Sequence, residues 1–387
     1  MSERRASGVG LGRVAQSAEA VASAAATPDE RLLRVSLATR LMRRPELGAI
    51  AGLILVVVFF ALTASPEMFS LSGILTILSP AAQLGIMAIA AALLMIGGEF
   101  DLSIGSMVAF AGLVFGVLVV DAHWPMWAAI VATMSVAAGV GVLNGQLVIR
   151  TRLPSFIVTL AFLFILRGLS LVGLKLATGG TTQLRGIHDA LGDTPLAALF
   201  SGSALHGLFV WLARRNLIAS LGNGDPAADG IPISIPWFIL CTAVATWVLL
   251  RTRTGNWIFA VGGDPRAARN SGVPVDRVKT GLFVITACSA ALVAILTVMD
   301  AGSTDAARGT QKEFQAIIAA VIGGCLLTGG YGSAIGAFFG AIIFGTVSIG
   351  LTYTNFDSDW FQVFLGGMLL LAVLFNNFVR KKVTGER

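Results

Sequence analysis

The chain has 387 residues, of which 56% are hydrophobic and 12% are charged, and its formal net charge is +6. Soluble domains carry about 25% charged residues, so this composition excludes a soluble globular fold. It predicts an all-α polytopic membrane protein, with the lipid bilayer as a partner. A nucleic-acid partner is not expected, because the basic residues gather in the segments between apolar runs.

The first part of the chain differs from the rest. It is rich in alanine and serine, with scattered charges and without the apolar core of a signal peptide. This pattern predicts a disordered cytoplasmic tail over residues 1–45. The apolar remainder, residues 46–382, is expected to form one transmembrane domain.

Apolar runs of membrane-spanning length follow one another along this domain. Counting about 20 residues for each crossing predicts roughly ten transmembrane helices, some of them broken or re-entrant. In chain order the predicted helices are Leu47–Ala64, Ser72–Gly97, Ser103–Val120, Met126–Ile149, Pro154–Leu174, Pro236–Leu250, Thr280–Met299, Phe314–Leu327, Ala334–Leu351 and Trp360–Val379. Pro80 predicts a kink in the second.

Basic residues are concentrated in alternate loops of this arrangement. By the positive-inside rule these loops face the cytoplasm, which places both termini and the basic loop 251–279 inside the cell. Residues 175–235 then form a long extracytoplasmic loop. Within it, the apolar stretch Leu205–Leu217 is too short for two further crossings and predicts a surface or re-entrant helix.

The basic cytoplasmic loop contains a short helix signature. Asp264 can cap a helix that has Pro265 at its first position, and Gly272 can take the left-handed closing position. The predicted helix has about two turns and presents Ala267 and Ala268 on one face. Two interpretations are open: a solvated turn between two spans, or a helix that docks in a groove of another protein.

Two carboxylates, Glu99 and Asp101, interrupt the apolar sequence between the second and third predicted helices. Charge near a bilayer is costly unless it faces water or a partner. One interpretation is a broken helix beside a translocation path. The other is that Asp101 caps the third helix, and both can hold. Residues 324–332 repeat the glycine spacing of residues 97–105, which hints at an internal repeat.

Polar residues inside two other predicted helices need partners. Arg167 lies in the middle of the fifth apolar run, where a cation is paired or water-facing, or snorkels if that helix is short. Asn144, in the fourth helix, suits an interhelical hydrogen bond with a structural role.

Catalytic and metal-binding signatures are missing from the sequence. His123, His188 and His206 lack ligand spacing, so no metal and no cofactor are expected. Without a Gly-x4-Gly-Lys-Ser/Thr loop the chain should not hydrolyse ATP itself, and no Gly-x-Ser-x-Gly elbow points to a hydrolase.

Four blocks of sequence carry a family resemblance when taken together. They are Glu99–Ser106, Asn144 to Gly168, Thr252 to Gly272, and Ile317 to Ser333. From about Pro45 to Lys381 the chain resembles the membrane permease subunits of bacterial ABC-type monosaccharide importers, in the ribose, xylose and arabinose branch.

This resemblance implies a permease of the bacterial inner membrane that pairs with a second permease subunit. The two subunits are expected to be identical. It also implies a separate cytoplasmic ATPase and an extracytoplasmic sugar-binding protein. The residues expected to couple to the ATPase are Thr254, Gly255, Ala260, Gly262, Gly263, Asp264, Ala267, Ala268 and Gly272. The residues expected along the translocation path are Gly98, Glu99, Asp101, Ser103, Asn144, Phe156, Thr159 and Arg167.

Two other classes of function fit the sequence less well. An ion-coupled secondary transporter of a small polar solute needs intramembrane carboxylates as a relay, and only Glu99 and Asp101 come near that role. An intramembrane enzyme would need a nucleophile–base pair, which the sequence does not offer. Asn256, Asp264 and Arg266 depart from the family pattern, and the sequence does not assign the sugar.

Overall fold

The structure is a computed structural model, and it describes residues 45–192, 194–221, 225–354, 356–357 and 359–384. The predicted tail, all but its last residue, lies outside the described residues. The described part is mainly helical, and its four strands have only two or three residues each, which confirms the all-α prediction.

Each of the ten predicted apolar runs corresponds to a helix in the described part of the chain. These helices are α3 (Pro45–Thr63), α4 (Leu71–Ile96), α5 (Ile104–Val120), α6 (Met126–Thr151), α7 (Ser155–Ala177), α10 (Ser234–Arg251), α13 (Val275–Ala301), α14 (Lys312–Ile322), α15 (Ala334–Gly350) and α16 (Trp360–Thr384). Most of the predicted boundaries agree within a few residues. The helix predicted to end at Leu327 is shorter, because the chain leaves the helix at Gly323 and Gly324 takes a left-handed φ of 89°.

Seven of the described helices are long and apolar enough to cross a membrane: α3, α4, α6, α7, α10, α13 and α15. The chain is therefore a polytopic membrane protein. Helix α5 and the Trp360–Leu371 part of α16 are apolar but shorter, and α14 has only 11 residues. The number of crossings and the side on which the termini lie stay predictions.

The remaining elements are short. They are η2 (Pro66–Phe69), β1 (Gln183–Arg185), α8 (Ile187–Leu191), η3 (Ala197–Leu199), β2 (Ser203–Ala204), α9 (His206–Arg214), β3 (Ile231–Pro232), α11 (Arg253–Gly263), α12 (Pro265–Asn270), β4 (Ser303–Asp305) and η4 (Leu351–Tyr353). Strand β1 pairs antiparallel with β4, and β2 pairs antiparallel with β3. Helix α9 confirms the short helix predicted inside Leu205–Leu217.

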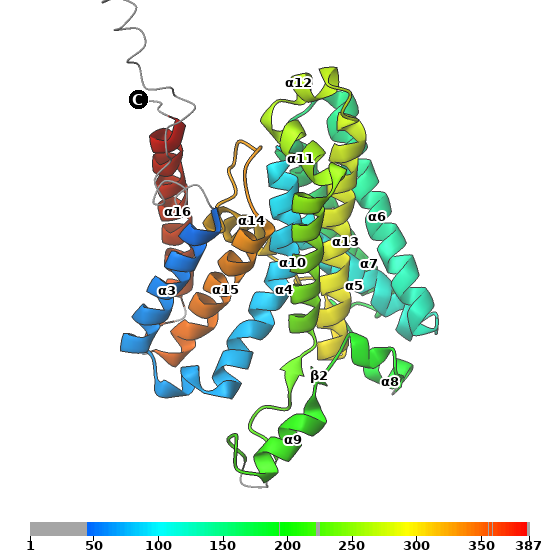
Figure 1. The fold of residues 1–387 in the computed structure, drawn as a ribbon. Coiled ribbons are helices and arrows are strands. Elements are labelled where there is room, and N and C mark those ends of the chain that lie inside the picture. Colours follow the sequence, from blue (N-terminus) through cyan, green and yellow to red (C-terminus); the bar gives the residue numbers. More distant parts are fainter. Residues whose placement is uncertain (1–44, 193, 222–224, 355, 358, 385–387) are drawn as a thin grey trace, which may run out of the picture. The chain divides into compact units, whose positions relative to one another are not determined.

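Helix α4 forms the centre of the described bundle. Its second half, from Ala81 to Ile96, is apolar except at Gln83 and is buried almost without interruption, as expected of a helix surrounded by others. It packs against α10, α13, α14 and α15, and Figure 1 shows it between α15 on one side and α10 and α13 on the other. The helix continues through Pro80; the kink at that residue stays a prediction.

Other helices turn apolar side chains outward. Leu62 on α3, Phe164 and Leu176 on α7, and Trp247 on α10 are among the exposed large hydrophobic residues. On a water-soluble protein such a surface would be a liability, whereas on a membrane protein it is the surface that contacts lipid or another subunit.

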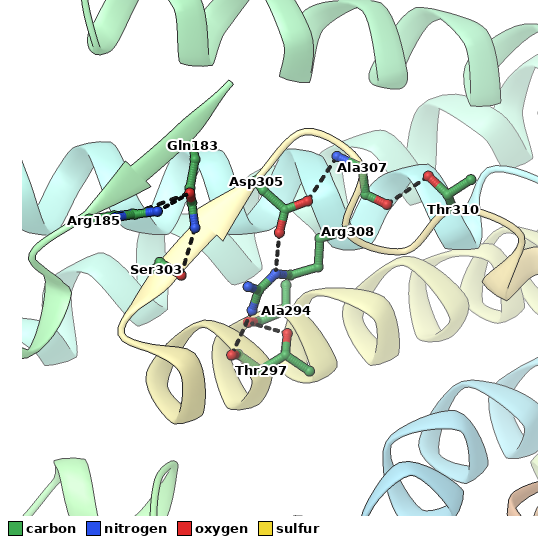
Figure 2. A network of polar contacts seen from close by, with 9 residues as sticks. All are labelled: Gln183, Arg185, Ala294, Thr297, Ser303, Asp305, Ala307, Arg308 and Thr310. Atoms are coloured by element: carbon green, nitrogen blue, oxygen red, sulfur yellow. Dashed lines mark hydrogen bonds and ion pairs between the residues drawn. The ribbon is translucent and has the colours of Figure 1, made fainter. Parts of the chain in front are cut away.

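The loop predicted outside the cell is tied to the end of α13 through the β1–β4 pair. Figure 2 shows Arg308 between two partners: its Nε donates to Oδ2 of Asp305 (3.2 Å) and its Nη1 donates to the carbonyl oxygen of Thr297 (2.6 Å). On the neighbouring strand, Nε2 of Gln183 donates to Oγ of Ser303 (3.5 Å). These contacts fix the start of the long loop against the bundle.

Candidate functional site

The segment between α4 and α5 is a true helix break, and side chains of α7 bind its backbone. The backbone N–H of Phe100 donates to Oγ of Ser155 (3.0 Å), and that of Leu102 donates to Oγ1 of Thr159 (3.0 Å). Ser155 and Thr159 are four residues apart, so they lie on one face of α7. The two donors that the break leaves without helical partners are therefore satisfied by hydroxyls of a neighbouring helix.

Asp101 lies at the centre of this break and is 4% exposed. Its Oδ1 accepts from the backbone N–H of Ser103 (2.8 Å) and from the hydroxyl of Ser103 (2.5 Å). Its Oδ2 accepts from Oγ1 of Thr286 on α13 (2.7 Å). Asn144 on α6 donates to Oγ of Ser103 (3.0 Å). The prediction that Asp101 caps α5 is wrong in detail: Ser103 is the N-cap residue and no side chain of the described residues caps the helix, because Asp101 binds Ser103 itself and not the first helical N–H groups. The hydrogen bond predicted for Asn144 is present, and it joins α6 to the residue at the start of α5.

Asp101 and Ser103 come from the break, Asn144 from α6 and Thr286 from α13, and each of the four is at most 4% exposed. A buried carboxylate without donors would be costly, and here three hydrogen bonds compensate it. We call this set the Asp101 network. It locks α5, α6 and α13 around the break.

A second contact joins the break to α13. Glu99 forms an ion pair with Lys279 in the second turn of α13, and both side chains are largely buried. Lys279 and Thr286 are seven residues apart, about two helical turns, so both project from the same side of α13. Both carboxylates of the break therefore contact the same side of α13.

Arg167 has a partner, as expected of a cation in the middle of a span. Its Nη2 lies 3.6 Å from Oε1 of Glu313, whose side chain is 2% exposed. Glu313, in the first turn of α14, packs over Gly105 of α5, where a Cβ atom would lie 1.9 Å from Oε2. The pair connects α7, α14 and α5 at a point separate from the Asp101 network.

The residues predicted along the translocation path therefore do not form one site. Asp101, Ser103, Asn144 and Thr159 come together, with Glu99 at the edge, whereas Arg167 belongs to the other pair. Phe156 is 51% exposed on the outside of α7. None of the predicted path residues lines the large apolar groove of the described chain.

The predicted coupling helix is present as α12. Oδ1 of Asp264 accepts from the backbone N–H groups of Arg266 (2.8 Å) and Ala267 (3.1 Å), and Pro265 occupies the first helical position. Gly272 has a φ of 82°. The capping prediction is confirmed at each of these positions. Figure 1 places α12 at one end of the bundle, next to α11.

The two alanines expected on one docking face of this helix point in different directions in the structure. Ala268 is 5% exposed and packs inside the chain, whereas Ala267 is exposed together with Pro265, Arg266 and Arg269. Successive residues of a helix point about 100° apart, so neighbours seldom share a face. Ala267 is thus the alanine of this pair that an external partner can reach.

Helix α11, which precedes α12, was not predicted. Oγ1 of Thr252 caps it by accepting from the N–H of Gly255 (3.2 Å). Its glycines lower the intrinsic helix propensity of this segment, but they allow another part of the backbone to pack closely against the helix. At Gly262 a Cβ atom would lie 1.7 Å from the carbonyl oxygen of Ile96, at the end of α4.

Both glycine-rich turns of the proposed repeat meet at Gly262. A Cβ atom added to Gly98 would lie 3.4 Å from the α-carbon of Gly262. A Cβ atom added to Gly329 would lie 2.8 Å from the carbonyl oxygen of Gly262. The N–H of Gly330 donates to the carbonyl oxygen of Ile96 (2.8 Å). We call this contact the glycine junction. Through it the α11–α12 segment touches both helix breaks, backbone against backbone.

Sequence reasoning missed three residues of this region. Thr286, Lys279 and Glu313 are the partners of Asp101, Glu99 and Arg167, and each lies far from its partner in the sequence. A weak signal was available for two of them: Thr286 is a hydroxyl within an apolar run, and Glu313 is a carboxylate at the edge of one.

Together, the spans, the interrupted helices and the interlocked break define a polytopic membrane protein. A family model described as "Branched-chain amino acid transport system / permease component" matches residues 73–373. Because that match covers most of the chain, the chain belongs to this family of membrane permeases.

The similar proteins are transport subunits and not enzymes. The xylose transport system permease protein XylH of Escherichia coli (strain K12) is 29% identical over 364 residues, which cover 86% of this chain and 92% of that protein. The ribose import permease protein RbsC of the same strain is 30% identical over 325 residues, or 84% of this chain and 91% of RbsC. XylH of Haemophilus influenzae is 28% identical over 359 residues, or 85% and 95% of the two chains. The comparison with solved structures finds no match.

Proposed function

We propose that the chain is the permease subunit of an ATP-driven importer for a monosaccharide. An extracytoplasmic binding protein delivers the sugar, and a separate cytoplasmic ATPase supplies the energy. The observation that carries this proposal is the similarity to XylH and RbsC over more than four fifths of the chain. Their names describe xylose transport and ribose import, so a pentose is the first substrate to test.

The proposal includes a location and an orientation. The chain spans the bacterial inner membrane with its permease domain, residues 46–382, while the tail and both termini are cytoplasmic. The basic segment 251–279 is then the coupling loop, and 175–235 is the long outer loop. The charge distribution supports this arrangement, and a second copy of the chain completes the permease.

Coupling would run through α12 and the glycine junction. Helix α12 is capped, exposed at one end of the bundle, and too short to be stable without packing against something. The other residues assigned to coupling, Thr254, Gly255 and Ala260, belong to α11. A push on α12 would reach both helix breaks, because α11 contacts them directly.

The test is uptake of labelled xylose and ribose by cells that contain the chain with its cognate ATPase and binding protein. Replacing the exposed alanine, Ala267→Trp, is expected to lower uptake by at least about tenfold, the effect of a lost interface contact. Arg214→Ala on α9, at the opposite loop, serves as the surface control. The amount of chain in the membrane should be equal in all three.

Two outcomes would contradict the proposal. Normal uptake by Ala267→Trp would mean that α12 docks against no ATPase. Uptake that persists without the ATPase and collapses with the proton gradient would instead identify an ion-coupled secondary transporter.

A further inference from the structure

A long apolar groove opens between α10 and α13. Both helices pack against α4, which forms the floor of the groove, and the two helices lie next to each other in Figure 1. The groove has a volume of about 480 Å³ and is lined by side chains such as Leu93, Val244, Leu282 and Ile285. The groove does not suit a sugar, because a polyhydroxylated solute would lose its hydrogen bonds to water there. Sugar transport therefore does not explain the groove.

The two ends of the groove differ in chemistry. One end is lined by Trp237. The ring Nε1 of Trp237 donates to the carbonyl oxygen of Leu199 (2.8 Å), and the ring stacks on Phe200 with centroids 5.6 Å apart. At the other end the groove is lined by Thr254 and Arg277. Both of these residues are exposed, and Arg277 forms no ion pair with another described residue.

The length of the groove follows from the helix that forms its wall. Its lining residues on α13 run from Arg277 to Leu292, which at 1.5 Å per residue is about 22 Å. This exceeds the depth of one leaflet of a bilayer whose apolar core is about 30 Å thick. A whole acyl chain therefore fits along it.

We propose that this groove binds one acyl chain of a phospholipid, with the lipid phosphate at Arg277. An unfilled apolar groove would lose contacts along its whole wall, and water is a poor substitute in an apolar space. The occupant must be apolar over the length of the groove and anionic at one end. A basic site between membrane helices matches a phospholipid headgroup in this way, and the guanidinium suits a phosphate.

Neither the groove nor its occupant depends on the proposed sugar import. The orientation proposed above adds only that the headgroup would lie in the cytoplasmic leaflet. A sugar is excluded by the apolar wall. A helix of a second copy is the remaining competitor, and the experiment below separates it from lipid.

Gly281, on the wall of the groove, allows a direct test. Apart from its own helix and chain neighbours, no heavy atom of the described residues lies within 4 Å of the position that its Cβ would take. The substitution Gly281→Leu should therefore fill the groove without disturbing the helix packing. Gly139→Leu on α6 is the matched control, because the space beside Gly139 is equally open and Gly139 does not line the groove.

The full chain is reconstituted in vesicles that contain phosphatidylglycerol with a photoreactive acyl chain. After illumination, labelled peptides are counted by mass spectrometry. Label is expected on the groove-lining faces of α10 and α13. Gly281→Leu should lower it by about tenfold, the effect of over-packing a filled site, whereas Gly139→Leu should leave it unchanged. Equal labelling in Gly281→Leu and the unmodified chain would overturn the proposal.

A second pair of variants tests the headgroup. Arg277→Gln should lower the labelling by about tenfold, as expected for loss of a charge-assisted hydrogen bond, and Arg150→Gln, an exposed arginine at the end of α6, should not. Unchanged labelling in Arg277→Gln would contradict the placement of the phosphate. Cys241 and Cys288 both line the groove, so a thiol crosslink between two chains at Cys241 would show a second copy there and overturn the lipid assignment.

Discussion

The two glycine-rich turns share their spacing, but they are held in different ways. The early turn, between α4 and α5, depends on side chains: Asp101 and Glu99 bind α13, and α7 supplies hydroxyls to the backbone. The late turn, between α14 and α15, is shaped by glycine backbone, with φ values of 89° at Gly324 and 82° at Gly329. A similar sequence pattern can thus support a polar lock in one half of a molecule and a close-packed joint in the other.

This difference predicts which substitutions each turn tolerates. The late turn and the glycine junction should respond to added volume, whereas the early turn should respond to lost hydrogen bonds. The comparison can be tested by substitutions of each kind, measured as thermal unfolding of the purified chain in one detergent.

The largest effect is expected at the glycine junction. Gly262→Ala would place a Cβ atom 1.7 Å from the carbonyl oxygen of Ile96, so α4 and α11 would have to separate. A destabilisation of about 3 kcal/mol or more is expected. The neighbouring Gly263→Ala is the control, since in the described part of the chain no heavy atom of another segment lies within 4 Å of the added Cβ. Equal unfolding midpoints for the two variants would show that the junction is not closely packed.

A smaller effect is expected at the polar lock. Asp101→Ala would leave the N–H and hydroxyl of Ser103 without their acceptor. It would also remove one of two acceptors of the Thr286 hydroxyl, which can still donate to the carbonyl oxygen of Phe283. Buried donors that lose an acceptor cost about 1–3 kcal/mol, so a loss of about 2–3 kcal/mol is expected. Asp101→Asn keeps one acceptor oxygen and should lose less. The exposed Asp121→Asn, at the other end of α5, should change little.

The smallest effect is expected for the side-chain cap at the end of the late turn. Oγ of Ser333 accepts from the N–H of Gly336 at the start of α15 (3.3 Å), and Ser333→Ala should cost about 1 kcal/mol or less. If this variant proved as damaging as Asp101→Ala, the late turn would also depend on side chains, and the contrast between the two turns would fail.

Local patterns in the sequence were sufficient for much of the fold. Run length located the apolar helices, because a span must bury its own backbone polar groups whatever its neighbours are. The cap of α12 was equally local: Asp264, Pro265 and Gly272 act within one turn of their own positions.

Contacts between side chains that are far apart in the sequence could not be predicted. Asp101 and Thr286 are separated by 185 residues, and no periodicity links them. Helix α11 was missed because Gly255, Gly262 and Gly263 lower its intrinsic helix propensity. Two of these glycines are explained only by another segment: Gly255 faces the backbone at Leu249, and Gly262 faces Ile96. Phe156 was assigned to the path through the family resemblance, and the structure places it on the exposed side of α7, so its role in the path stays a prediction.

The central claim is that α12 faces the cytoplasm, where an ATPase can reach it. The most direct test is Ala267→Cys labelled with a membrane-impermeant maleimide, in intact cells and then in opened cells. Ala267 is exposed, whereas the native Cys241, Cys288 and Cys325 lie within the bundle as intermediate or buried residues. Labelling that appears only after the cells are opened is the predicted result. Labelling of Ala267→Cys in intact cells would place α12 outside and contradict the account.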